Sequence, residues 1–254
     1  IRASDWSSDV CSSDLFGQLF QCELVNNKVN PYQITLNPST KLRILIISDT
    51  HLGASLPFSK SCNIFIEEMK NIIKKENPAM IFHLGDLVNG TFPDGSKLLL
   101  DVLTKLDTLE IPIYFIPGNH DREYLNGLMP KWKQLKFITP LQNNSIQVSI
   151  PSGKDHPKQT NIFFAHDLNN NYRVRDQYAL SFVNWIKGGS NLIKPEDWLI
   201  IGHTHCQLIS FASKAMCVGQ FSPEINIFGY SIIDIDDSDF ALCSKYLPGK
   251  IYQK

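Results

Sequence analysis

The sequence has no excess of charge of either sign. Its 24 Lys and Arg residues stand against 25 Asp and Glu residues, which gives a formal net charge of −1 at pH 7. Proteins that bind nucleic acid or anionic membranes over a large surface usually carry a surplus of positive charge. The overall charge therefore supports neither function, although it leaves room for a local basic patch. Apolar residues make up 43% of the chain, which excludes global disorder.

The sequence also lacks a membrane span, a secretory signal and a paired-cysteine motif. No apolar run approaches the roughly 20 residues of a spanning helix, and no charged start precedes an apolar stretch. Its six cysteines include no CxxC pair. A chain of 254 residues does not need disulfides for stability, so we expect reduced thiols and a cytoplasmic location. The chain begins with Ile1 rather than Met, which leaves open an anchor or signal upstream.

Residues 1–15 differ from the rest of the chain. They read IRASDWSSDVCSSDL, in which SSD occurs twice and no helical or strand period is sustained. We interpret this segment as a non-native or disordered leader, and residues 16–254 as a single domain. Residues 16–36 suggest two short strands about an Asn-rich turn, which predicts a hairpin at a sheet edge.

From residue 42 onward, short apolar runs alternate with amphipathic stretches. This order is typical of an α/β fold with a central sheet, whose strands are buried on both faces. Strands are expected at 42–48, 79–84, 111–116, 161–165 and 198–201, helices at 62–76, 97–109 and about 175–187, and a terminal hairpin within 219–246.

A polar block follows each of the five apolar strands. The blocks are SDTHLG with Asp49 and His51, GDLVNG with Asp86, GNHD with Asn119, His120 and Asp121, AHD with His166, and GHTH with His203 and His205. The carboxyl ends of the strands in an open α/β sheet line one crevice, so residues far apart in sequence converge there. We therefore expect these side chains to form one site.

The residue types in these blocks indicate divalent metal ions. Asp, Asn and His suit Mn, Fe, Zn, Co or Ni, whereas a calcium site uses oxygen alone and a structural zinc site usually uses Cys. Seven candidate ligands exceed what one four-coordinate ion needs, but two ions could share them if Asp86 bridged the pair. Two ions roughly 3.5–4 Å apart can clamp the attacking and leaving oxygens of a displacement at phosphorus.

The ordered series DxH, GDxxN, GNHD, isolated His and GHxH resembles the calcineurin-like metallophosphoesterase family, over about residues 41–207. The resemblance implies an α/β fold, a two-sheet αββα sandwich of the metallophosphoesterase type. It also implies metal-dependent hydrolysis of phosphomonoesters or phosphodiesters of small molecules. The nucleophile would be a metal-bound hydroxide, so neither Ser nor Cys need serve.

Carried over position by position, the resemblance also implies roles for individual residues. One ion would be held by Asp49, His51, Asp86 and His205, and the other by Asp86, Asn119, His166 and His203. His120 would contact the phosphoryl group and assist the leaving oxygen. We expect Asp121 to orient His120, because an imidazole needs a fixed tautomer to act as an acid.

Three other residues near these motifs have simpler interpretations. Asn89 completes GDLVN, where we expect a helix cap or a bond to a ligand rather than ligation itself. His83 lies within a strand and is expected to be a core histidine or one bonded behind the ligands. Cys206 follows GHTH directly, and we expect a buried free thiol there rather than a ligand.

Three arginines are candidates for substrate contacts. Arg122 follows GNHD, where it could bind phosphate or form a surface salt bridge. Arg173 and Arg175 lie in the Asn-rich loop 167–176, directly after His166. Guanidinium groups suit phosphate, and this loop composition favours a compact phosphorylated metabolite or nucleotide over a long polymer.

Other functions fit parts of the same pattern. SDTHLG, GNHD and GHTH are also similar to the DNA double-strand-break repair nucleases of this family, although the balanced charge does not favour extended DNA contacts. The family's UDP-diacylglucosamine hydrolases suggest a nucleotide-sugar or lipid pyrophosphate substrate, but their histidine block commonly departs from GNHD. A catalytically dead scaffold module would be expected to have lost ligands. The sequence does not specify the substrate, the physiological metals or the oligomeric state.

Overall fold

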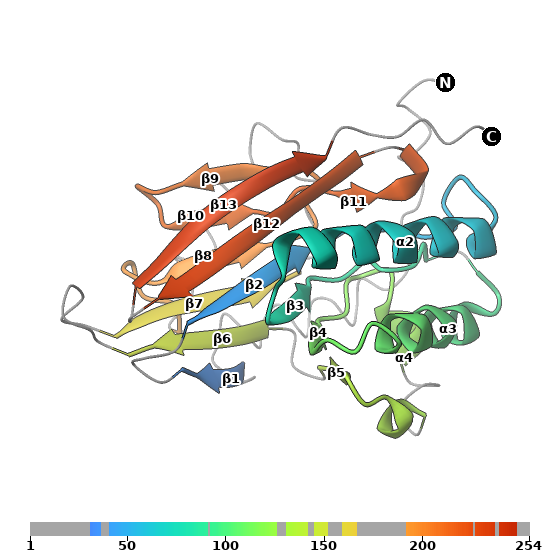
Figure 1. Ribbon diagram of the computed structural model, residues 1–254, viewed down its shortest axis with the longest axis horizontal. Helices are drawn as coiled ribbons and strands as arrows, with labels where there is room; N and C mark the ends of the chain where they lie inside the picture. The colour runs from blue at the N-terminus through green and yellow to red at the C-terminus, as the bar shows by residue number, and fades with distance from the viewer. Residues whose placement is uncertain are drawn as a thin grey trace.

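The computed structural model describes residues 31–36, 41–90, 92–125, 131–141, 145–151, 159–166, 192–225, 227–236 and 239–247. These residues form two mixed β-sheets that pack face to face (Figure 1). This arrangement confirms the two-sheet α/β sandwich that the resemblance implies. The leader 1–15, the expected helix at 175–187 and the loop 167–176 lie outside the described residues.

The first sheet has the strand order β11-β12-β2-β3-β4-β5, with β13 paired to β12. Its parallel part consists of β2 (Leu42–Ile47), β3 (Met80–His83), β4 (Ile113–Phe115) and β5 (Ile138–Pro140). Its antiparallel part consists of β11 (Phe221–Ser222), β12 (Ile227–Asp236) and β13 (Asp239–Leu247). The β12–β13 pair confirms the expected C-terminal hairpin.

The second sheet has the strand order β1-β6-β7-β8-β10-β9. Its strands are β1 (Tyr32–Thr35), β6 (Ser145–Ile150), β7 (Thr160–Ala165), β8 (Trp198–Ile201), β9 (Leu208–Ser210) and β10 (Ala215–Cys217). Strands β7 and β8 run parallel, with Ile162 opposite Trp198. Strand β1 also pairs in parallel, with β6, while the first strand of the expected hairpin at 16–36 lies outside the described residues.

The described helices α2 and α3 pack against the first sheet (Figure 1). Helix α2 (Phe58–Glu76) starts four residues earlier than expected, because the Pro57 carbonyl accepts the amides of Lys60 and Ser61. Helix α3 (Gly95–Asp107) starts two residues early and is followed by α4 (Arg122–Leu125). Short 3₁₀ turns occur at η2 (Trp132–Gln134) and η4 (Pro223–Ile225). No helix among the described residues is both long and apolar enough to cross a membrane.

Alternation along β2 shows why its last four residues, 44–47, are all apolar. Leu45 and Ile47 pack under the helices, whereas Ile44 and Ile46 pack in the cluster between the sheets. Side chains alternate across a strand, so a strand covered on both faces needs apolar residues at every position. The apolar runs are therefore a sound signal for buried strands, but they do not indicate that these strands divide between two sheets rather than one.

The end of α2 is joined to the first sheet by a buried carboxylate. Only 3% of the Glu76 side chain is exposed; it accepts hydrogen bonds from the Tyr230 hydroxyl at 2.8 Å and the Lys245 ammonium at 2.7 Å. Arg43 Nη1 lies 3.6 Å from the same carboxylate. Burial alone would raise the pKa of Glu76, but the bonds from Lys245 and Tyr230 outweigh burial and lower it. The ionised carboxylate therefore stabilises the folded state, and this contribution is lost as pH falls.

We predict that Glu76→Gln lowers the free energy of unfolding by about 2 kcal/mol at neutral pH, because the buried Tyr230 hydroxyl and the half-buried Lys245 and Arg43 lose their charged partner. Urea denaturation of the two proteins measures the difference. The matched control is Glu67→Gln, which removes an exposed pair with Lys70 and should change little. The difference between wild type and Glu76→Gln should shrink below about pH 4, where carboxyl groups protonate; a difference that grew there would contradict the assignment.

Candidate metal centre

The ends of five strands from both sheets meet at one place. Strands β2, β3 and β4 belong to the first sheet, and β7 and β8 to the second. The side chains that follow them and gather here are Asp49, His51, Asp86, Asn119, His120, His166, His203 and His205. The convergence expected from the sequence is therefore present, although it takes place between two sheets rather than along one.

One cluster of potential ligand atoms is formed by Asp49, His51 and His205, all within 4.8 Å of one another. The Nε2 atoms of His51 and His205 lie 3.1 Å apart, and His205 Nε2 lies 3.4 Å from Asp49 Oδ1. His51 Nε2 is also 3.7 Å from Asp86 Oδ2. These nitrogens and oxygens point at a shared space, which is the arrangement that one cation requires.

A second cluster is formed by Asp86, His166 and His203. The Nδ1 atom of His166 lies 2.5 Å from the carbonyl oxygen of Leu84, which can only accept, so the ring carries its proton on Nδ1. Its Nε2 atom then offers a lone pair toward Asp86 Oδ2 at 3.3 Å and Asn119 Oδ1 at 3.1 Å. Three acceptors that face one another at these distances fit a metal ion.

Asp86 belongs to the second cluster and also faces the first, because it forms a third group of potential ligands with His51 and His120. Its Oδ2 atom faces the Nε2 atoms of His51 and His166, while its Oδ1 atom accepts the backbone amide of His120 at 2.9 Å. One carboxylate oxygen thus lies between the two sets of nitrogens. This position fits the bridging role that the resemblance implies for Asp86.

The protonation states also suit metal ligation. Burial would raise the pKa of Asp49, but the charge and hydrogen bond of His205 lower it to about 2. Burial likewise opposes ionisation of Asp86, yet the neighbouring His166 and His120 hold its pKa well below the ordinary value. Burial lowers the pKa of His51 to about 3, so its ring is neutral. Burial opposes the charge of His205, but Asp49 raises the pKa of that ring, so a divalent cation would replace its proton in balancing the buried carboxylates.

Five potential ligand residues at the centre have a left-handed backbone conformation, which is uncommon for residues other than glycine. Positive φ angles occur at Asp49 (56°), His51 (48°), Asp86 (53°), His203 (64°) and His205 (55°). This left-handed conformation costs a non-glycine residue about 1–2 kcal/mol. Strain of this kind persists only where the surroundings hold it, and it concentrates at functional sites. Here it turns consecutive side chains toward the same space.

Two glycines allow the turn of Asp86 to lie against the GNHD loop. Gly85 has a φ of +89°, and a Cβ atom there would lie 2.6 Å from the Cα atom of Gly118. A Cβ atom on Gly118 would lie 2.1 Å from Asp86 Oδ1. Any larger residue at Gly118 would therefore displace the carboxylate that faces both clusters.

His120 lies edge-on to His51, with ring centroids 4.9 Å apart, and is only half-buried. The backbone amide of Gly90 donates to His120 Nδ1 at 3.0 Å. Because that nitrogen accepts, the neutral ring carries its proton on Nε2. The tautomer of His120 is therefore set by a backbone amide.

We expected Asp121 to contact the His120 ring, but the structure shows no such contact. Its buried carboxylate instead accepts the backbone amides of Leu87, Val88 and Gly118 at 3.0–3.2 Å. Burial and the nearby Asp86 charge raise the pKa of Asp121 to about 6. Asp121 thus ties the GNHD loop to the turn after Asp86, and the expected orienting contact is corrected to this backbone role.

The remaining expected residues occupy varied positions. His83 is buried beneath the centre, as expected. Cys206 forms no disulfide, as expected, but it is only half-buried. Arg122 opens α4 and is partly buried. The backbone amide of Asn89 donates to the Leu52 carbonyl, and this bond joins the two loops that carry His51 and Asp86. Arg173 and Arg175 lie outside the described residues.

Glu224 is a contributor that the sequence does not reveal. Its carboxylate accepts the backbone amides of Gly53, Ser55 and Leu56, in the loop directly after His51. The two segments are about 170 residues apart, and Glu224 stands in no motif. No signal in the sequence links it to the site.

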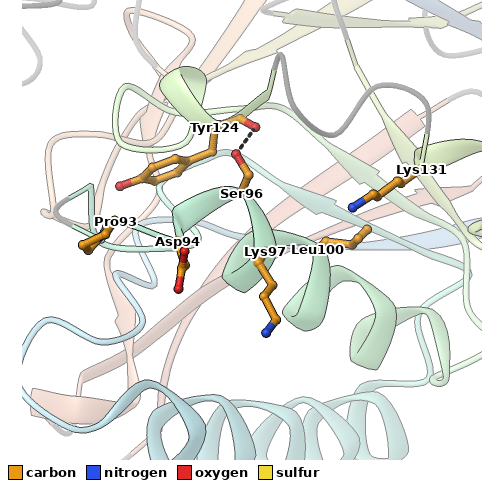
Figure 2. A pocket seen from close by; sticks show the side chains of 7 residues that line it. All are labelled: Pro93, Asp94, Ser96, Lys97, Leu100, Tyr124 and Lys131. Carbon is orange, nitrogen blue, oxygen red and sulfur yellow. Dashed lines mark hydrogen bonds between the residues drawn. The ribbon is translucent and has the colours of Figure 1, made fainter.

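A shallow pocket of about 290 Å³ lies away from the ligand clusters, beside the first turn of α3 (Figure 2). Asp94, Ser96, Lys97, Tyr124 and Lys131 are among the residues that line it, and the Ser96 hydroxyl donates to the Tyr124 carbonyl at 2.9 Å. None of the potential metal ligands lines this pocket.

Comparisons with known proteins identify relatives. The profile of the calcineurin-like phosphoesterase family matches residues 42–231. The chain is 32% identical over 94 residues to the DNA double-strand break repair protein Mre11 of Saccharolobus solfataricus, over 35% of this chain and 25% of that protein. It is 34% identical over 112 residues to one subunit of the nuclease SbcCD of Staphylococcus epidermidis, over 40% of this chain and 30% of that protein.

The chain thus spans less than a third of the length of these two curated relatives. Among solved structures, a dimetal phosphatase from Danio rerio aligns with 83% of this chain and 96% of its own. The identity is 10% and the TM-score 0.47.

We predict that Asp86→Asn weakens binding of both metal ions, because this side chain faces both clusters, whereas Asp49→Asn chiefly weakens one. Calorimetric titration with Mn(II) measures the affinity and number of sites. Asp101→Asn, on the exposed face of α3, is the matched control and should bind as wild type does. Loss of a single site in Asp86→Asn, with both lost in Asp49→Asn, would contradict the shared role of Asp86.

Proposed function

Because this chain belongs to the calcineurin-like phosphoesterase family, we propose that it hydrolyses phosphomonoesters or phosphodiesters of small molecules with two divalent metal ions. The observation that carries this proposal is the pair of neighbouring ligand clusters, with Asp86 Oδ2 facing a histidine of each. A scaffold module without activity would not need two such clusters, so we favour an enzyme.

We assign Asp49, His51, Asp86 and His205 to one ion, and Asp86, Asn119, His166 and His203 to the other. The nitrogen and oxygen donors suit Mn, Fe, Zn, Co or Ni. When bound, such ions supply an activated water and neutralise charge on the phosphoryl group. The αL turns of the chain direct its carboxylates and imidazoles toward the space where the ions would be held.

We assign His120 as the group that assists the leaving oxygen. Its Nε2–H is available for donation because Gly90 occupies Nδ1, and its half-exposed ring leaves access for a substrate. From this nitrogen the neutral ring can donate a hydrogen bond to the leaving oxygen and stabilise the negative charge that develops there as the bond to phosphorus breaks. Asp121 supports this step indirectly, since it holds the loop that carries His120.

The proposed substrate is compact. The balanced charge of the chain favours a small phosphoester over a long polymer, and Arg122, Arg173 and Arg175 are our candidates for phosphate contacts. We also propose a cytoplasmic setting, which the four described free cysteines support.

Nuclease activity is a second candidate. Of the two curated relatives named above, one is a DNA repair protein and the other is a subunit of a nuclease. The chain matches only part of each, so their activities do not transfer directly. A side-by-side assay of small phosphoesters and DNA with one preparation therefore distinguishes the two functions.

We predict that the purified protein hydrolyses nitrophenyl phosphate or bis-nitrophenyl phosphate when Mn(II) is present, that chelation abolishes this activity, and that added Mn(II) restores it. The same preparation is assayed on single- and double-stranded DNA over a range of salt concentrations. Efficient DNA degradation that falls steeply with salt would favour the nuclease. Full activity in verified metal-free protein would overturn the proposed function.

We predict that His120→Asn reduces kcat by about 10²–10⁴-fold for an alkyl phosphoester while it leaves Mn(II) binding intact. The loss should be smaller for a nitrophenyl ester, whose leaving group needs no protonation. Comparison of kcat for the two esters, with Mn(II) titration of both proteins, measures this. Equal losses for both leaving groups would argue against a role of His120 at the leaving oxygen.

A further inference from the structure

His83 lies at the end of β3, directly beneath the candidate metal centre. Only 1% of the residue is exposed, and both ring nitrogens have partners. The amide of Gly85 donates to Nδ1 at 3.2 Å, and Nε2 lies 3.0 Å from the Thr50 hydroxyl oxygen. The ring also packs edge-on against Phe115, with centroids 5.5 Å apart.

The contacts fix the proton of His83. A backbone amide can only donate, so Nδ1 accepts and Nε2 carries the proton. Nε2 therefore donates to the Thr50 oxygen. Burial lowers the pKa of His83 to about 3, which keeps the ring neutral. His83 is thus an uncharged ring that donates a hydrogen bond from Nε2 to Thr50 and accepts one at Nδ1 from Gly85.

The two partners of His83 belong to the two turns that carry ligands. Thr50 stands between Asp49 and His51, and Gly85 precedes Asp86. Backbone bonds also join these turns, from the Asp49 amide to the Gly85 carbonyl and from the His51 amide to the Asp86 carbonyl. Every ligand in these turns has a positive φ angle, so the turns need contacts that hold them.

A purely packing role does not account for a histidine at this position. The ring lies near Phe65 and Phe115, where another phenylalanine would pack without the cost of removing two polar nitrogens from water. Histidine recovers that cost only through Thr50 and Gly85. The specific gain from His83 is therefore the geometry of the two turns.

We propose that His83 is a positioning residue for the metal centre, which fixes the Asp49–His51 turn relative to Asp86 through Thr50 and Gly85. This inference rests on the proposed function, because it assumes two ions that share Asp86. His83 touches neither ion nor substrate; it acts on the distance between the two ligand clusters.

The test compares four variants with wild type, using Mn(II) as the probe. His83→Phe keeps the packing and loses both bonds, and His83→Gln offers Thr50 a donor in place of Nε2. Thr50→Val removes the same bond from the other side. Thr104→Val is the matched control, because it removes a hydroxyl that bonds within α3, away from the site. Calorimetric titration measures affinity, and EPR detects the exchange coupling of two neighbouring Mn(II) ions.

We expect His83→Phe and Thr50→Val to weaken Mn(II) binding by about 10–100-fold and to reduce the exchange-coupled signal. His83→Gln should recover part of both, and Thr104→Val should match wild type. A role in stability alone would lower the melting temperature without changing the coupling in protein that remains folded.

Wild-type affinity and coupling in folded His83→Phe would overturn the inference. If His83→Phe does not fold, Thr50→Val decides, because it leaves the buried ring in place; unchanged coupling there also overturns it. A wild-type protein that binds fewer than two Mn(II) ions overturns the proposed function, and this inference with it. Two coupled ions in wild type and in both variants overturn this inference alone.

Discussion

The centre depends on the close approach of two backbone turns. The turn at Gly85 and Asp86 lies against Gly118 so closely that neither glycine can carry a side chain. The amides of Gly118 and His120 then bond to Asp121 and Asp86, respectively. This contact places one carboxylate between two groups of imidazoles. Without it, the strand ends would still converge, but no single group would serve both clusters.

The two-sheet architecture supplies the second condition. His51 and Asp86 come from strands of the first sheet, whereas His166, His203 and His205 follow strands of the second. The distance between the sheets is set by the apolar cluster in which Phe82 and Phe164 meet edge to face, with centroids 4.8 Å apart. A rigid core of this kind keeps ligands from separate sheets in register. The packing between the sheets is thus part of the site.

The potential ligands are predictable because sequence position and chemistry coincide. Asp49, Asp86 and His203 each follow an apolar run closely, so the end of a strand and the start of a polar block are visible together. Buried strands are visible for the same reason. The parallel pairing of β1 with β6 is not visible, since nothing in a four-residue, mostly exposed strand specifies its partner.

Contacts that depend on backbone atoms are the least predictable. Asp121 stands beside His120 in the sequence, which suggests a contact between their side chains, yet its carboxylate faces backbone amides across the turn. Glu224 is invisible in the sequence because its three partners are amides in a distant loop. Backbone donors are the same in almost every residue, so no choice of side chain marks them in a sequence.

The same property explains how the site orients its imidazoles. His166 bonds to the Leu84 carbonyl, His120 to the Gly90 amide and His83 to the Gly85 amide. A carbonyl assigns the proton to the contacting nitrogen, and an amide assigns it to the opposite one. The backbone around Asp86 therefore determines which imidazole presents a lone pair and which presents a proton. These backbone groups lie in turns that the glycines and Asp121 hold in place. The contacts that fold these turns therefore also determine which ring nitrogen of each histidine carries the proton.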